Sequence, residues 1–317
     1  MDRHISYARV GFLAEELQIR SGLRVLRTAR GNDPGNKGFW EEIADPSGRI
    51  LRLRRVSKSN DPATTEIFNL LCRTFSEDEA DTLETIQSDV TDPDVAFFVI
   101  QEKNNPRVLA LINVYVLPVG PSGLQLFIGY VVTDDTERDK SLASRLYRAA
   151  CLFFMRRSEI KAREAYGIVG EMVETVEEFF LKVGGCRRLY VETPERILEI
   201  PYIQPPLDFD KRTGRPLKNP VPEHLMLRLV DYGDELSVED VLKIVWSIYE
   251  SYFFEEDDFE SEKAYHRHCA VMSELFENLK RSLPDPSSRV FMMNHVIRQG
   301  LARDLKNAGR KLVEVTT

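Results

Sequence analysis

Three apolar runs of strand length follow one another in the middle of the chain, and they limit what it can fold into. They cover residues 95–100, 108–116 and 124–132, and short turns containing Asn, Pro and Gly separate them. Turns this short join antiparallel neighbours, because a parallel pair needs a crossover of a dozen or more residues. The sequence therefore predicts an antiparallel three-stranded meander.

Helix and strand signals alternate before and after this meander. Period-2 alternation and short apolar runs indicate strands, and apolar residues at helical spacing indicate helices. The predicted elements are a strand at 50–56, a helix from Pro62, a helix over 142–153, a strand at 165–169, a helix at 173–183, and strands at 187–193 and 224–230. The long Pro-rich connection between the last two strands contains Tyr202 and is typical of a functional loop.

The 317 residues divide into three predicted regions. Residues 1–48 form a basic N-terminal arm, 49–231 hold the alternating strands and helices, and 232–317 are predicted to be a helical extension. Up to Lys58 the chain has 12 Lys and Arg against 7 Asp and Glu. We expect the arm to pack as a solvated segment. The alternative is contact with an acidic partner or with the acidic C-terminal part of the chain.

The composition excludes several classes of protein. A formal net charge of −8 argues against a nucleic-acid-binding protein, which needs clustered Lys and Arg. No apolar run approaches the roughly 18–20 residues of a membrane span, and the N-terminus lacks the apolar segment of a signal peptide. The four cysteines form no C-x-x-C pair, and His266 and His268 do not share a helix face, so no metal site is expected. We expect a soluble, cytoplasmic protein.

The segment after the third strand of the meander is suited to binding phosphate. A polar loop leads from this strand into a helix that begins with small residues at Ser141, Ala143 and Ser144. The first turn of a helix presents unpaired N–H groups and a partial positive charge, and small side chains let an anion approach them. Arg138 and Lys140 would add charge-assisted contacts.

The same segment resembles the GNAT superfamily of acyl-CoA N-acyltransferases. Arg138 and Ala143 match the superfamily motif Arg/Gln-x-x-Gly-x-Gly/Ala, and Ser141 replaces a glycine. The order of the predicted elements over 49–231 is also similar to this superfamily. The resemblance implies an α/β (α+β) fold with a mixed, mostly antiparallel sheet flanked by helices. The C-terminal helices lie outside the resemblance.

The resemblance also implies the substrates and the donor site. The donor would be acetyl-CoA or a longer acyl-CoA, or an acyl-carrier protein, and the acceptor would be an amine of a small molecule, an amino acid or a peptide. Pantetheine would pair with the strand, and pyrophosphate would bind the loop and the helix start. The residues expected to bind the donor are Tyr130, Val131, Val132, Arg138, Asp139, Lys140, Ser141, Leu142, Ala143 and Ser144.

The expected reaction is direct attack of the amine on the thioester, with a base that takes the amine proton and an acid that protonates the thiolate. Glu171 is the first candidate base, because it follows a predicted strand and is expected to face the cleft. Glu79 is the second, since it follows the first helix, where acceptor loops of this fold usually lie. A working base needs a pKa raised by partial burial.

The acid is where the sequence departs from the superfamily, because Phe180 stands where many members have a tyrosine. Either Tyr202 or Tyr190 substitutes, or the thiolate leaves without a dedicated acid, or transfer activity is lost. Tyr202 is the candidate that we carry forward. The departures at Phe180 and Ser141 motivate the alternative function, a non-catalytic acyl-CoA-binding regulatory or interaction module.

A third interpretation is an interaction protein whose basic arm and acidic patch at 255–258 pair between two chains as a homodimer. His224 is expected to be a satisfied core residue, and Cys151 and Cys186 are expected to be small apolar core residues. The aromatic run at 249–254 is expected to pack a helix, with a tunnel for a longer acyl chain as the alternative.

Overall fold

The computed structural model describes nine stretches of the chain. These are residues 24–28, 38–45, 47–76, 79–137, 141–172, 177–193, 196–230, 236–293 and 311–313. The chain divides into two compact units. The first comprises residues 1–76, 80–118 and 122–167, and the second comprises 77–79, 119–121 and 168–317. This division does not test the three predicted regions, which stay a prediction.

The strands of the first unit form a sheet in the order of the sequence. They are β1 (Arg24–Thr28), β2 (Trp40–Ala44), β3 (Ile50–Val56), β4 (Val95–Glu102), β5 (Val108–Val119) and β6 (Gly123–Thr133). Each pair from β1–β2 to β4–β5 is antiparallel. The predicted meander is β4, β5 and β6, in which the apolar runs are almost wholly buried.

Residues 40–44, which lie in the region predicted to be an N-terminal arm, form β2. This strand pairs with β3 from Trp40 opposite Arg54 to Ala44 opposite Ile50, and the side chain of Ile43 is fully buried. The sequence of β2 lacks clean period-2 alternation, so its own pattern gave no strand signal.

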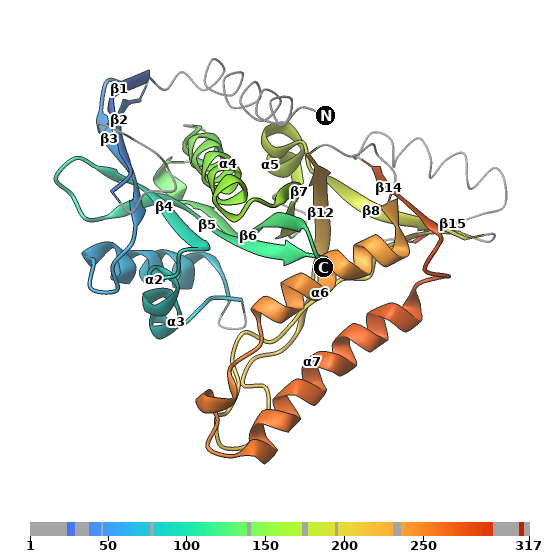
Figure 1. Cartoon of the computed structure of the whole chain (residues 1–317). Coiled ribbons are helices and arrows are strands. Elements are labelled where there is room, and N and C mark those ends of the chain that lie inside the picture. Colours follow the sequence, from blue (N-terminus) through green and yellow to red (C-terminus); the bar gives the residue numbers. More distant parts are fainter. Residues whose placement is uncertain are drawn as a thin grey trace. The chain divides into compact units, whose positions relative to one another are not determined.

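Helices cover both faces of this sheet. They are α2 (Pro62–Thr74), α3 (Leu83–Asp89) and α4 (Leu142–Lys161). Figure 1 shows α4 on one side of β4–β6 and α2 with α3 on the other. Asp61 begins α2 by accepting a hydrogen bond from the Ala63 N–H, and Pro62 fits the first helical turn because it has no N–H to satisfy. The short α3 was not predicted.

The C-terminus of α4 carries a residue in an unfavourable backbone conformation. The Arg163 N–H donates to the Ser158 carbonyl and the Ala162 N–H to the Glu159 carbonyl, which is the Schellman pattern. Ala162 stands where glycine is usual, at φ +50°.

Replacing Ala162 by glycine is expected to stabilise the protein by about 1 kcal/mol, since the left-handed conformation costs a non-glycine residue roughly 1–2 kcal/mol. Urea unfolding measures the change. Ala149→Gly inside the same helix is the control and is expected to destabilise by about 1 kcal/mol. A loss of stability in both variants would contradict the assigned helix end.

The second unit carries its own set of strands. They run in the order β7 (Glu164–Met172), β12 (His224–Leu229), β8 (Arg187–Glu192), β14 (Arg289–Met293) and β13 (Leu236–Ser237), and β9 (Arg196–Glu199) pairs with β8 and with β15 (Lys311–Val313). The β9–β15 pair is parallel, and β12–β8, β8–β14 and β8–β9 are antiparallel. The predicted class, a mixed and mostly antiparallel sheet flanked by helices, is confirmed.

Two parts of this unit differ from the sequence prediction. The long Pro-rich connection contains β9 and a two-stranded ribbon, β10 (Ile203–Gln204) with β11 (Val221–Pro222). The helical region also contributes β13, β14 and β15. Strands of two to five residues are too short for a periodicity to identify them.

The helices of the second unit are α5 (Glu177–Phe179), a π-helical turn (Phe180–Gly184), α6 (Val238–Ser251) and α7 (Glu262–Ser282). A capping box begins α6: the Ser237 side chain accepts from the Asp240 N–H, and the Asp240 carboxylate accepts from the Ser237 N–H. Within the stretches that the structure describes, no helix combines the length and the apolar character that crossing a bilayer requires.

Candidate active site

The buried carboxylate of Glu171 is the centre of a hydrogen-bonded cluster in the second unit. Glu171 lies inside β7 rather than after it, and its side chain is buried. The Tyr202 hydroxyl donates to Oε1, and the Tyr252 hydroxyl donates to Oε2 over 2.9 Å. The Gln204 amide Nε2 donates to Oε2 over 3.2 Å. Three donors from two other segments therefore hold one carboxylate.

The local structure explains why these side chains converge. Tyr202 and Gln204 are two residues apart on an extended segment, so their side chains project to the same side. Pairing of Gln204 with Val221 fixes the register of this segment. Tyr249 in α6 and Tyr252, the residue that follows its last turn, lie three residues apart on one side, and the Tyr249 hydroxyl donates to the Ile203 carbonyl over 2.6 Å. This bond ties α6 to the ribbon.

Burial changes the acid–base properties of the cluster. Loss of solvation raises the pKa of Glu171 to about 7, and the hydrogen bonds from Tyr202, Tyr252 and Gln204 limit the rise. The pKa of Tyr202 is raised well above its usual range, chiefly by burial and then by the negative charge of Glu171. The Tyr202 hydroxyl therefore stays protonated, while Glu171 is poised to gain and lose a proton near neutrality.

Two further carboxylates belong to this neighbourhood. Glu223 directly follows β11, and its main-chain N–H donates to the Tyr202 carbonyl over 3.3 Å. Its pKa is raised well above the usual value by burial and by the charges of Glu171 and Glu79. The charges of two predicted catalytic residues, Glu171 and Glu79, thus both act on Glu223, while Tyr202 is hydrogen-bonded to Glu171.

Sequence reasoning missed Gln204, Glu223 and the role of Tyr252. Gln204 was recognisable in principle, because it lies two residues after Tyr202 in an extended, Pro-flanked segment. Tyr252 lies in the aromatic run at 249–254, which the sequence predicts to pack a helix, so no role was expected for its hydroxyl. Nothing in the local sequence indicated the burial of Glu223.

The residues expected to bind the donor lie in the first unit. Tyr130 and Val132 are buried in β6 and Val131 is half-buried, while the Tyr130 hydroxyl accepts from the Asp81 N–H over 3.1 Å. Arg138, Asp139 and Lys140 lie outside the described residues.

Ser141, Leu142, Ala143 and Ser144 form the start of α4. Ser141 has φ +59° and ψ 20°, a conformation that favours the glycine of the superfamily motif. Its side chain makes no capping bond to the helix, so the first-turn N–H groups are not capped by the hydroxyl. A 20-residue helix that begins this way offers N–H donors and its positive dipole end to an anion.

The other candidate residues fall into structural roles. His224, expected in the core, is buried in β12, and its Nδ1 lies 2.7 Å from Glu199 Oε1. Cys151, Cys186 and Phe180 are buried as well, so the aromatic ring of Phe180 occupies a packed position.

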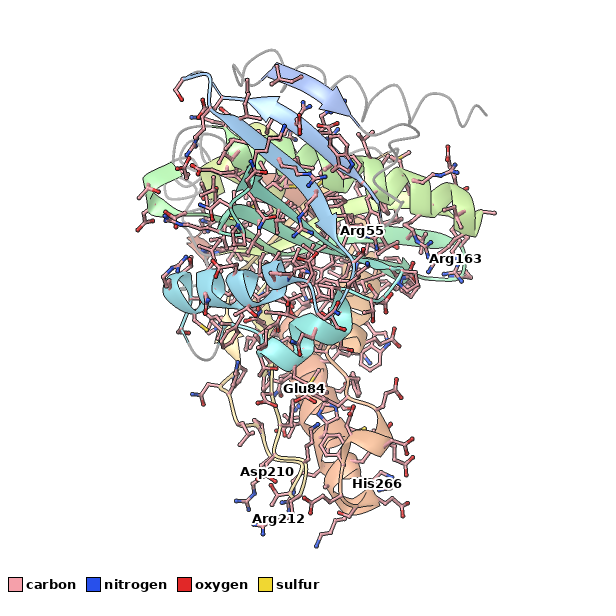
Figure 2. All side chains as sticks on the ribbon, turned by 90° about the vertical axis from the view of Figure 1, so that its left-hand side faces the viewer. Arg55, Glu84, Arg163, Asp210, Arg212 and His266 are labelled. Atoms are coloured by element: carbon pink, nitrogen blue, oxygen red, sulfur yellow. The ribbon has the colours of Figure 1, made fainter. Side chains whose placement is uncertain are left out.

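The two histidines of α7 do not form a metal site. The side chain of His266 is exposed, and Figure 2 shows it at the same end of the second unit as Asp210 and Arg212. His268 is fully buried beside the ring of Phe209, and burial lowers its pKa to about 4. Among the residues that the structure describes, no three possible metal ligands lie together.

Solved structures resemble the chain over part of its length. NAA60 of Arabidopsis thaliana, in complex with acetyl-CoA, matches 57% of this chain and 99% of its own at 9% identity, with a TM-score of 0.40. A GNAT-family protein of Bacteroides thetaiotaomicron matches 56% of this chain and 85% of its own at 15% identity, with a TM-score of 0.36. A chain of the NatC complex bound to Gag peptide and CoA matches 56% of this chain and 98% of its own at 13% identity, with a TM-score of 0.37.

Each of these matches covers little more than half of this chain. Identities and TM-scores this low say nothing about the reaction. No protein-family model matches the sequence, and no curated protein matches it.

Proposed function

We propose that the protein is an N-acyltransferase and that Glu171 is its general base. The observation that carries this proposal is the buried carboxylate, whose pKa is raised to about 7 and which accepts from the Tyr202 hydroxyl. A base with a pKa near the working pH is ionised often enough to take a proton and weak enough to release it.

Glu171 and Tyr202 account for both proton transfers of the reaction. The amine nitrogen attacks the thioester carbonyl carbon, so a C–N bond forms and the C–S bond breaks. Glu171 takes the proton that the nitrogen loses. Tyr202 gives its proton to the departing thiolate and regains one from protonated Glu171, to which it is hydrogen-bonded. Tyr202 would thereby replace the missing tyrosine at Phe180.

The donor is acetyl-CoA or a longer acyl-CoA, with the start of α4 as the pyrophosphate site. The uncapped first turn of α4 and the left-handed Ser141 support this assignment. The expected acceptor is an amine of a small molecule, an amino acid or a peptide.

A direct assay tests the function. The protein is incubated with acetyl-CoA or a long-chain acyl-CoA and a panel of amines and peptides, and release of free thiol and formation of the amide are measured. Turnover of any pair supports the proposal. Calorimetric binding of acyl-CoA without turnover over the whole panel would support the non-catalytic binding module instead, which the buried Phe180 motivates.

Ser144→Asp tests the donor site separately. An added carboxylate in the first turn of α4 would repel pyrophosphate, so we expect the Kd for CoA to rise by about tenfold or more. The same carboxylate stabilises a helix N-terminus, so unfolding should not account for the loss. Ser144→Asn, which is similar in size and neutral, is the control. Unchanged CoA affinity in Ser144→Asp would move the pyrophosphate elsewhere.

A further inference from the structure

The side chain of Glu223 is largely buried and has no partner among the residues that the structure describes. Its residue is 7% exposed, and its side chain makes no hydrogen bond or ion pair with any residue whose placement the structure gives. A ligand with N–H donors that reaches this carboxylate would supply hydrogen bonds that the described residues do not.

Gln204 carries a second unpaired acceptor in the same neighbourhood. Its Nε2 donates to Glu171, whereas its Oε1 has no hydrogen-bond partner among the residues that the structure describes, and the residue is 7% exposed. Gln204 lies on the β10–β11 ribbon and Glu223 directly follows it, and the pairing places Gln204 opposite Val221, two residues before Glu223. The Glu223 carboxylate and Gln204 Oε1 are therefore two neighbouring acceptors without a donor among the described residues.

The charges around Glu223 indicate which kind of ligand it would bind. The charges of Glu171 and Glu79 both raise the pKa of Glu223, so a positive charge beside Glu223 would be stabilised. Among residues with described side chains, neither Glu171 nor Glu223 forms an ion pair with Lys, Arg or His. The rings of Tyr202, Tyr249 and Tyr252 complete the surroundings of Glu171, and aromatic faces attract cations. The partner is a cation with several N–H donors.

We propose that the acceptor is an aliphatic diamine or polyamine, whose second ammonium group binds Glu223 and Gln204 Oε1 while Glu171 takes the proton of the reacting amine. The reacting nitrogen needs only one base, and the ammonium group supplies the donors that the two unpaired acceptors lack. This inference depends on the proposed acyl transfer only for the role of the reacting amine. The ammonium site itself is argued from the side chains of Glu223 and Gln204.

Binding of amines to the protein without any acyl donor tests the site. We compare 1,4-diaminobutane with n-butylamine at pH 7 by calorimetry and expect the diamine to bind at least about tenfold more tightly. Glu223→Gln keeps the shape of the side chain and removes its charge. The variant should bind the two amines with about equal affinity, and its affinity for butylamine should equal that of the wild type. Glu260→Gln, an exposed site in the same unit, is the matched control and should keep the preference.

The outcomes separate this inference from the proposed function. Equal affinity for the two amines, or a preference that survives Glu223→Gln, would overturn the ammonium site even if monoamines are acylated. A diamine preference that depends on Glu223 supports the site even if no acyl-CoA is consumed. A second readout is proton release: diamine binding should release protons, measured as a dependence of the binding heat on the buffer, and Glu223→Gln should abolish it.

Discussion

Replacing Glu171 by glutamine is expected to lower kcat/KM for acyl transfer by about 10²–10⁴-fold. Positioned general bases contribute factors of this size, and glutamine keeps the shape of the side chain but cannot accept the proton. Glu171 accepts from Tyr202, Gln204 and Tyr252, and glutamine replaces one of its two acceptor oxygens by an NH2 group that cannot accept from these donors. Glu164→Gln at the exposed start of the same strand is the control.

The pH profile identifies the base. Glu171 must be ionised to act and its pKa is raised to about 7, so kcat/KM should rise as the pH increases through about 7. In Glu171→Gln the remaining activity should lack this rise. A variant that loses activity but keeps the same profile would show that another group is the base.

The contribution of Glu171 to stability should decrease as the pH rises, whereas its contribution to activity should increase. The folded protein keeps its proton between the usual pKa of 4.5 and about 7, where the unfolded chain has released it. The unfolded state then binds fewer protons, so the free energy of unfolding falls as the pH rises through this window. Glu171→Gln should remove that slope, and at pH 8 the variant should be at least as stable as the wild type.

Replacing Arg188 by methionine is expected to cost about 3–5 kcal/mol of stability, the usual penalty for removing one partner of a buried ion pair. The Arg188 side chain is 2% exposed, and its Nη2 donates to Glu177 Oε2 over 2.6 Å. Its Nη1 lies 3.5 Å from Glu199 Oε1 and 3.0 Å from His224 Nδ1. The substitution leaves two buried carboxylates without this guanidinium group.

Urea unfolding of the full chain checks this expectation. Arg187→Met is the control, because the neighbouring arginine points to the other face of β8 and is half-buried. Adding Glu199→Gln to Arg188→Met should cost less than the sum of the two single changes, since the removed charges interact. A loss below about 1 kcal/mol for Arg188→Met would show that the network contributes little.

The sequence predicted the parts of the fold whose periodicity is local. The meander and α4 follow from apolar spacing, and the position of Ser141 in a glycine-like conformation agrees with the superfamily motif. Elements of two to five residues, such as β10, β13 and β14, were not predictable. Their pairing is decided by partners distant in the chain, such as β8 for β14.

The same limit applies to the candidate site. Glu171 and Tyr202 were candidates because carboxylates and hydroxyls next to predicted strands and functional loops are suited to proton transfer. Their hydrogen bond joins residues 31 positions apart, and the bond from Tyr252 spans 81 positions. Periodicity carries no information over such separations, so the burial that raises the pKa of Glu171 becomes visible only in three dimensions.

The bond between Tyr249 and the Ile203 carbonyl has a consequence for the order of events during synthesis. A ribosome releases β7 and the β10–β11 ribbon well before it completes α6, which ends at Ser251. Until α6 emerges, Glu171 lacks the Tyr252 donor and the ribbon lacks its anchor. Nascent chains shorter than this point would therefore hold the base in a wetter and less basic setting, and the acid–base chemistry would start only once the last helices have folded.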